Sequence, residues 1–233
     1  MTLSDIDIKG IKQGILRQHV SVNDYQLIQT DYTGHEKTSY FEHFIDDLAM
    51  LSSISEIKSY LKEKMKAIMK HQFMEAYHHH FDTIFVSPIY TQLFYNQVQN
   101  AVLVLKEMNV DQSLLDFIQS QTLQDMIPII DLFNKNSSKL LKPNGSIFVL
   151  SDIFQCKEDD PFYHKILESI DSIDQMDKLH EIYVDTYGYG LGDYGLYSMS
   201  NHFKIKNHSW LIWPFADQVH LCVKIVLFEL SEK

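Results

Sequence analysis

Acidic and hydroxyl side chains stand where short apolar runs of this sequence end. Asp5 and Asp7 close the first run, Asp31 closes the second, and Ser87 and Tyr90 follow the third. Carboxylates accept hydrogen bonds and hydroxyls both donate and accept them, so these groups suit the binding and positioning of a polar ligand. No Ser-His-Asp or Cys-His spacing in the sequence predicts covalent catalysis.

His78, His79 and His80 carry side chains that bind metals. Three successive residues cannot point to one face of a helix or a strand, however, as a shared metal ion requires. We therefore expect a polar helix-to-strand connection at this place and no metal site.

Two apolar runs are typical of buried parallel strands whose carboxyl ends open into a ligand crevice. The first covers residues 83–86 and stops at Ser87-Pro88. The second covers residues 146–150, follows a Pro143-Asn144-Gly145 turn and stops at Ser151-Asp152. The long helical stretch between the two runs predicts the crossover that parallel neighbours need.

The remaining segments predict an alternation of strands and helices. Apolar residues recur with the period of one helix face between residues 40 and 77, and the methionines of this stripe fit core or lid packing better than a ligand pocket. Other expected helices are 10–18, 93–141 (broken near 109–111 and at Pro128) and 161–180; other expected strands are 3–8, 25–33, 181–184 and a hairpin of 210–215 with 219–228.

Together these segments resemble the class I S-adenosylmethionine-dependent methyltransferases. Residues 83–86 and 146–150 resemble family strands four and five, and Leu141-Lys-Pro-Asn-Gly145 resembles the "LKPGG" turn before strand five. The segments 3–8 and 25–33 resemble strands two and three, and the terminal hairpin resembles strands six and seven. The resemblance covers nearly the whole chain and implies an α/β, Rossmann-like, mostly parallel sheet with a C-terminal antiparallel hairpin.

The family's first strand and its glycine-rich turn, D/E-x-G-x-G-x-G, have no counterpart ahead of residues 3–8. We therefore expect a single domain, 1–233, that is N-terminally incomplete and carries a helical insertion or lid at 35–80. In the family's strand order, 3-2-1-4-5-7-6, strand one is central. Its loss predicts either open sheet edges prone to self-association, closure of strand two onto strand four, or a chain that naturally begins upstream.

The resemblance also implies roles for the acidic residues near the N-terminus. Asp7, with Asp5 in reserve, matches the carboxylate that accepts the ribose hydroxyls of S-adenosylmethionine, and Asp31 matches the one that holds the adenine amino group, with Tyr32 against the ring. Alternatively, Asp7 caps a helix or is a solvated strand-end acid, and Asp31 forms an Asx-turn.

Ser87-Pro88-Ile89-Tyr90 occupies the position of the family's N/D-P-P-Y motif, which faces the reacting methyl group. Ser87 and Ile89 depart from that motif, which weakens the case for an amine as the methyl acceptor. Tyr90 is a candidate for orienting the nucleophile, and the alternative is a packed aromatic residue at a helix start.

Gly188-x-Gly190-x-Gly192 has the spacing of a nucleotide-binding turn, so a circularly permuted domain is an alternative. The polar, bulky residues ahead of it favour a substrate loop rich in glycine and tyrosine instead.

Composition limits the classes of partner. With 45% hydrophobic residues the chain has enough apolar side chains for a core, and a net charge of −11 disfavours binding to nucleic acid. Two distant cysteines, the lack of an apolar signal segment and the lack of a long apolar run predict a cytoplasmic protein that does not bind membranes.

The expected function is S-adenosylmethionine-dependent methyl transfer to a small molecule or a protein side chain. Because the glycine-rich turn is missing, we expect cofactor binding and activity to be impaired in this chain. The alternative is a non-catalytic, methyltransferase-like binding or assembly module.

Overall fold

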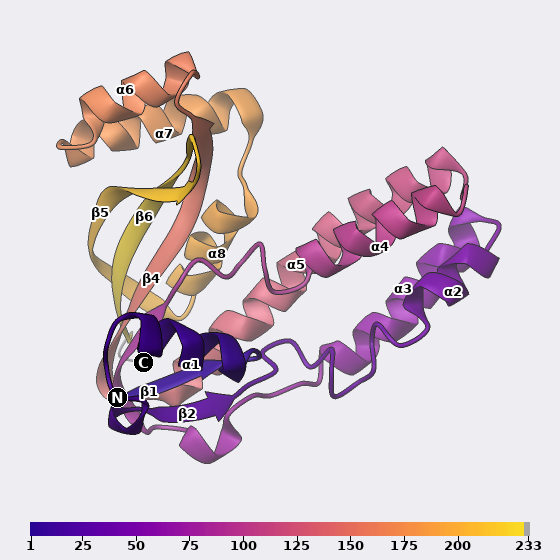
Figure 1. Cartoon of the computed structure of the whole chain (residues 1–233), viewed down its shortest axis with the longest axis horizontal. Coiled ribbons are helices and arrows are strands. Elements are labelled where there is room, and N and C mark those ends of the chain that lie inside the picture. The colour runs from indigo at the N-terminus through magenta and orange to yellow at the C-terminus, as the bar shows by residue number, and fades with distance from the viewer. Residues whose placement is uncertain (231–233) are drawn as a thin grey trace. The chain divides into compact units, whose positions relative to one another are not determined.

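The structure is a computed structural model that describes residues 1–230, and it divides the chain into two compact units (Figure 1). The first unit comprises residues 1–76 and 99–121, and the second comprises residues 77–98 and the chain from residue 122 onwards. The helical segment expected as a lid at 35–80 lies mostly in the first unit, and its role as a lid stays a prediction.

The first unit begins with two parallel strands. β1 (Thr2–Asp5) pairs with β2 (Gln26–Gln29) in a register that runs from Thr2 opposite Gln26 to Asp5 opposite Gln29. Helix α1 (Ile8–Arg17) and the short 3-10 helix η1 (Val22–Asp24) connect them. The predicted strand–helix–strand order is confirmed, and both carboxyl ends lie at one edge of this small sheet.

Two helices follow in the first unit. α2 (Phe44–Met50) is short, and α3 (Ile54–Ile68) begins at Ser53, whose hydroxyl accepts a hydrogen bond from the backbone N–H of Glu56. Such a cap satisfies one of the N–H groups that a helix start leaves unpaired. The stripe predicted from helical periodicity is core, because its members are buried: Ile57, Leu61, Met65 and Ile68.

Along the chain, α4 (Tyr95–Glu107) begins in the second unit and ends in the first, and α5 (Gln112–Leu140) begins in the first and ends in the second. The short η2 (Glu75–Tyr77) precedes β3. The predicted break near residues 109–111 is confirmed, with Asn109 in the left-handed region at φ +62°. The break predicted at Pro128 is wrong, since α5 continues through it. A proline removes one helix hydrogen bond, and burial of its neighbours Met126, Ile129 and Ile130 offsets that loss.

The second unit holds a four-stranded sheet in the order β3-β4-β6-β5. β3 (Phe81–Val86) is parallel to β4 (Leu141–Lys157), and β6 (Val219–Leu230) is antiparallel to both β4 and β5 (Phe203–Ala216). The predicted parallel neighbours and the C-terminal hairpin are confirmed. Matched to the family's numbering, the order reads 4-5-7-6, and β2-β1 reads 3-2, so the predicted α/β, methyltransferase-type arrangement of strands is confirmed.

The Pro143-Asn144-Gly145 segment is a bulge inside β4 and not a turn ahead of it. β4 begins at Leu141, and its register against β3 shifts between the pairs Phe81–Leu141 and Thr83–Ser146. Asn144 takes φ +64°, and a Cβ on Gly145 would stand 3.2 Å from the backbone oxygen of Asp82. The extra residues thus fit between the strands because Asn tolerates the left-handed conformation and Gly the close approach.

Three helices pack beside this sheet: α6 (Pro161–Ser169), α7 (Ile173–Tyr187) and α8 (Leu191–Ser200). α6 and α7 lie side by side next to the sheet (Figure 1). With β4 and β5 they enclose a buried cluster that includes Phe154, Met176 and Trp210. Pro161 stands in the first turn of α6, as predicted. The strand predicted at residues 181–184 is wrong, because they belong to α7. Without a strand before Gly188, the permuted arrangement has no support.

Among the described strands, β3 hydrogen-bonds only to β4, and β1 only to β2. Self-association through such open edges stays a prediction. No helix in residues 1–230 is both long enough and apolar enough to cross a bilayer.

The bulge in β4 yields a first prediction. Asn144→Val should lower the free energy of unfolding by about 1–2 kcal/mol, since a β-branched residue fits the left-handed region poorly. Asn144→Gly is the matched control and should be neutral or slightly stabilising. Urea unfolding followed by circular dichroism measures both, and equal midpoints for the valine variant and the parent would contradict the assignment.

Candidate functional site

Asp5, Asp7 and Asp31 lie at or just after the carboxyl ends of β1 and β2, where the backbone N–H of Thr30 donates to the backbone oxygen of Asp5 at 2.9 Å. Asp5 accepts a hydrogen bond from the backbone N–H of Asp7 at 3.0 Å. Asp7 in turn caps α1, because its Oδ1 accepts the N–H of Gly10 at 3.0 Å. The geometry therefore matches the helix-cap alternative for Asp7, although both side chains remain exposed at the edge.

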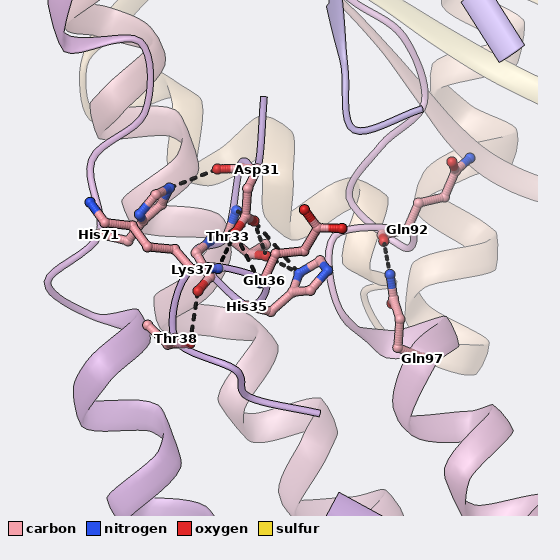
Figure 2. Close-up of polar contacts among 10 residues, drawn as sticks. Asp31, Thr33, His35, Glu36, Lys37, Thr38, His71, Gln92 and Gln97 are labelled. Carbon is pink, nitrogen blue, oxygen red and sulfur yellow. Dashed lines mark hydrogen bonds and ion pairs between the residues drawn. The ribbon is translucent and has the colours of Figure 1, made fainter. Parts of the chain in front are cut away.

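Asp31 is the centre of a web of hydrogen bonds from its own loop (Figure 2). Oδ1 accepts the backbone N–H of Gly34 at 2.8 Å and of Thr33 at 3.3 Å. Oδ2 accepts the N–H of Glu36 at 2.9 Å and of Lys37 at 3.1 Å. With both oxygens occupied in this way, the carboxylate serves as an Asx-type loop anchor, which is the alternative weighed against adenine binding.

The electrostatics of this loop keep Asp31 ionised. Burial alone would raise the pKa of Asp31, but the N–H groups of Lys37 and Gly34 and the nearby rings of His35 and His71 outweigh it and lower that pKa. His71 also contacts the backbone oxygen of Asp31 through Nε2 at 2.7 Å. A Cβ on Gly34 would stand 2.5 Å from the His71 ring, so only glycine fits there.

Tyr32 points back to β1. Its hydroxyl donates to the backbone oxygen of Ser4 at 2.9 Å and lies 2.5 Å from the Ser4 hydroxyl. Its ring packs edge-on against Phe73 with centroids 5.1 Å apart. Burial raises the pKa of Tyr32. The residue thus ties the loop after β2 to β1, and stacking on an adenine ring stays a prediction.

In the second unit, the segment 87–90 leaves the carboxyl end of β3. Ser87 is exposed, Pro88 is buried, and the backbone oxygen of Pro88 accepts the Gln92 amide at 3.0 Å. Tyr90 is fully buried, and its hydroxyl donates to Asn134 at 3.1 Å. Burial raises the pKa of Tyr90. An enclosed, paired hydroxyl matches the packed-aromatic alternative rather than contact with a nucleophile.

Asp152 is not among the site residues predicted from the sequence. It lies beyond the paired ends of the parallel strands, since the last pair is Val86 with Val149. Oδ2 is 3.5 Å from the Thr91 hydroxyl, while Oδ1 is buried and has no hydrogen-bond partner among the described residues. Burial raises the pKa of Asp152, opposed by its own N–H and by Thr91. The strand end predicted at Ser151-Asp152 is wrong, because β4 continues to Lys157 and Asp152 pairs with Val223 of β6. These polar residues mark instead the place in β4 beside which β3 has ended.

Two other carboxylates of the second unit, Asp131 and Asp193, are hydrogen-bonded through both oxygens. Asp131 accepts hydrogen bonds from Ser198 and from Tyr194, at 2.5 Å and 3.0 Å, which helps raise the pKa of Tyr194 to about 12 along with burial. Asp193 holds His180 at 2.6 Å and caps α8 through the N–H of Gly190 at 3.1 Å. These hydrogen bonds connect α8 to α5 and α7, and they use both oxygens of Asp131 and of Asp193.

Comparison with solved structures finds matches of low similarity. The chain aligns over 99% of its length with the N-methyltransferase NodS of Bradyrhizobium japonicum WM9 in complex with S-adenosyl-L-homocysteine, at 12% identity and a TM-score of 0.36, and covers 66% of that chain. Another NodS structure matches at 13% identity and a TM-score of 0.36, over 99% of this chain and 73% of that chain. A third structure is described by the words "Conversion of a Disulfide Bond into a Thioacetal Group during Echinomycin Biosynthesis". It matches at 9% identity and a TM-score of 0.42, over 99% of this chain and 66% of that chain.

The chain thus spans about two thirds of the length of these solved structures. No protein-family model and no curated protein sequence matches it.

A second prediction concerns Asp31. Asp31→Ala removes the acceptor of four backbone N–H groups and should destabilise the loop by about 1–3 kcal/mol. Amide hydrogen exchange at Gly34, Glu36 and Lys37 should accelerate accordingly. Asp24→Ala, an exposed acid in the same unit, should leave these rates unchanged. Unaltered exchange in the Asp31 variant would show that the web does not hold the loop.

A third prediction concerns Asp152. Burial raises the pKa of Asp152 above its ordinary value. At pH values between these two, the folded protein keeps a proton on Asp152 that the unfolded chain has already lost. The stability of the parent relative to Asp152→Asn should therefore fall as pH rises through that window, leaving the variant more stable at neutral pH.

Urea unfolding at a series of pH values measures this difference, with the exposed Asp171→Asn as the control that should show no such trend. A difference between parent and Asp152→Asn that does not vary with pH would contradict a buried, unpaired carboxylate.

Proposed function

We propose that this protein is a methyltransferase-type domain that takes part in methyl transfer from a sulfonium donor to a small molecule or a protein side chain. The observation that carries the proposal is the strand order. β3-β4-β6-β5 and β2-β1 match strands 4-5-7-6 and 3-2 of the S-adenosylmethionine-dependent family, including the parallel pair and the antiparallel hairpin.

Polar groups beside the carboxyl end of β3 support the same function. Thr91 lies 3.5 Å from Asp152 there, and the exposed Ser87 directly follows β3, at the end of a parallel strand where ligands of open α/β sheets bind. Transfer of a methyl group from a sulfonium is an in-line displacement that depends mainly on positioning. The lack of a nucleophile–base pair in the sequence is therefore compatible with this chemistry.

We further infer that this chain binds the cofactor weakly. Asp7 and Asp31, the candidates for the ribose and the adenine, already accept hydrogen bonds from their own backbone. The first unit also contains no G-x-G turn, because its glycines are Gly10, Gly14 and Gly34. Without such a turn the methionine end of the cofactor lacks positioning as well as contact energy, which reduces catalysis more than binding.

The same observation favours a second candidate, a non-catalytic binding or assembly module. In that case the acidic residues of the first unit only stabilise the fold, through the hydrogen bonds that they accept from the backbone. The two candidates differ in whether a nucleoside sulfonium binds at all.

A fourth prediction separates these candidates. Isothermal titration calorimetry with S-adenosylhomocysteine should give a dissociation constant larger than about 1 μM, or no measurable heat of binding. Asp7→Ser is the matched variant, since serine retains the helix cap but removes the carboxylate. If Asp7 holds the ribose, this variant should weaken any measured binding while circular dichroism stays the same.

Micromolar or tighter binding together with methyl transfer to an added acceptor would contradict the inferred impairment. Complete absence of binding, at ligand concentrations up to the millimolar range, would favour the non-catalytic module.

A further inference from the structure

We propose that one face of the four-stranded sheet binds an amphipathic helix with a basic polar side, supplied by a partner protein. Five apolar side chains of this face, which we call the open face, stay at least partly exposed: Phe85 of β3, Phe148 and Leu150 of β4, and Ile225 and Leu227 of β6. Phe85 is 67% exposed, and its ring stacks on that of Phe148 with centroids 4.8 Å apart. The inference goes beyond the proposed function, because it holds whether or not the chain transfers methyl groups.

The strand register places these five side chains on the same side of the sheet. Phe85 lies opposite Phe148 in the parallel pair of β3 and β4. Phe148 in turn lies opposite Leu227, and Leu150 lies opposite Ile225. Residues directly opposite one another point to the same face, and so do residues two apart along a strand. The open face is therefore a continuous apolar stripe across three neighbouring strands.

The opposite face of the same strands is covered within the unit. The residues that alternate with the open face along β4 and β6 are almost fully buried: Ile147, Val149, Val226 and Phe228. Helix α8 lies on that side, since a Cβ on Gly192 would stand 2.7 Å from the hydroxyl of Ser151. The sheet is thus closely packed on one side and partly exposed on the other.

The residue types of the open face are those of a sheet that is covered on both sides. A sheet with one face in water alternates apolar residues on the packed side with polar residues on the other. On β6, however, the exposed side carries Ile225 and Leu227, and on β4 it carries Phe148 and Leu150. Contiguous apolar groups that remain exposed mark interaction sites. The pattern therefore indicates a second layer over this face.

The borders of the stripe determine the shape of the partner. On β5 the same face carries Asn207 opposite Leu227 and Ser209 opposite Ile225, and both polar residues are exposed. On the other side, β3 is the outermost described strand of the sheet. The apolar stripe is thus three strands wide, or about 10 Å between its outer strands. One α-helix, with a diameter of about 10–12 Å, covers that width.

The area of the stripe argues for a helix and against a second copy of the chain. A large side chain buries about 150–250 Å² in full, and all of the five except Phe85 are already more than half buried. The stripe therefore offers roughly 200–400 Å², whereas a stable dimer buries about 800 Å² on each partner. Helices also cover sheets that contain parallel strands, as β3 and β4 are.

Charge selects the polar side of that helix. The five side chains of the open face are all uncharged, and Glu229, the next residue of β6 on this face, is paired with Lys206. The chain as a whole carries a net charge of −11. A partner helix with lysine or arginine on its polar side is attracted by this charge, and one with aspartate or glutamate is repelled.

The test uses a fluorescent peptide of about 18 residues, long enough for five helical turns, with leucine and phenylalanine on one helix face and lysine on the other. A scrambled peptide of the same composition, which has no apolar face, is the matched ligand. Fluorescence anisotropy measures the binding of each peptide to the full chain. The amphipathic peptide should bind saturably, and the scrambled peptide should bind at least about tenfold more weakly.

Two variants assign the binding to the open face. Phe85→Thr and Ile225→Thr keep side chains that favour strands but remove apolar area, and each should weaken binding of the amphipathic peptide by about tenfold. Ile182→Thr is the control, because Ile182 is a 62% exposed residue of α7 and lies outside the open face. A nitroxide on the peptide should broaden the NMR methyl signals of Ile225 and not those of Ile182, and circular dichroism checks that each variant is folded.

Four results would overturn the proposal. The first is that the amphipathic peptide does not bind the parent chain. The second is equal binding of the two peptides, which would show attraction by charge alone. The third is equal binding by the parent, Phe85→Thr and Ile225→Thr, which would place the peptide elsewhere. The fourth is a dimer of the parent in analytical ultracentrifugation that Phe85→Thr abolishes, which would show that a second copy of the chain covers the face.

Discussion

The parallel pairing of β3 with β4 is the constraint on which the second unit depends. Because the two strands run in the same direction, their carboxyl ends must meet at one edge, and the chain must cross over through α4 and α5 between them. The register that sets Val86 opposite Val149 then places the loop from Ser87 beside Asp152. A slip of one residue would turn Asp152 under α8 and Ser151 toward the loop, which exchanges a carboxylate for a hydroxyl at the site.

The same rule acts on β1 and β2, with a different outcome. Acidic residues also follow the carboxyl ends of these strands, but there backbone N–H groups of the next residues donate hydrogen bonds to the carboxylates. Asp7 is used to start α1, and Asp31 to hold the loop that follows β2. Backbone N–H groups that lack other partners compete with a ligand for the same oxygens, and they are always present at high local concentration. An acid at a strand end is thus a site for a ligand only where the chain supplies no donor of its own.

The contrast also shows how far the sequence determines the site. Periodicity and apolar runs predicted the strands around residues 83–86, 146–150 and 219–228, because burial controls those patterns directly. They failed at Pro128 and at residues 181–184, where packing of the neighbours decided between helix and break. The same limit applies to Asp152: the sequence predicted a strand end there, whereas β4 continues to Lys157 because pairing with β6 extends it. Whether its carboxylate finds a donor also depends on contacts from distant segments.

An unpaired buried carboxylate lowers stability, and a fold selected for stability alone would replace it with asparagine or a small apolar residue. The neighbouring carboxylates show that this chain can supply donors from tyrosine, serine, histidine and lysine side chains. At Asp152 the nearest hydroxyl stops at 3.5 Å and serves only one oxygen. Close packing of Gly192 against the backbone oxygen of Asp152 leaves β4 little room to shift toward a donor. The carboxylate therefore remains a local cost to stability among acids whose oxygens are otherwise hydrogen-bonded.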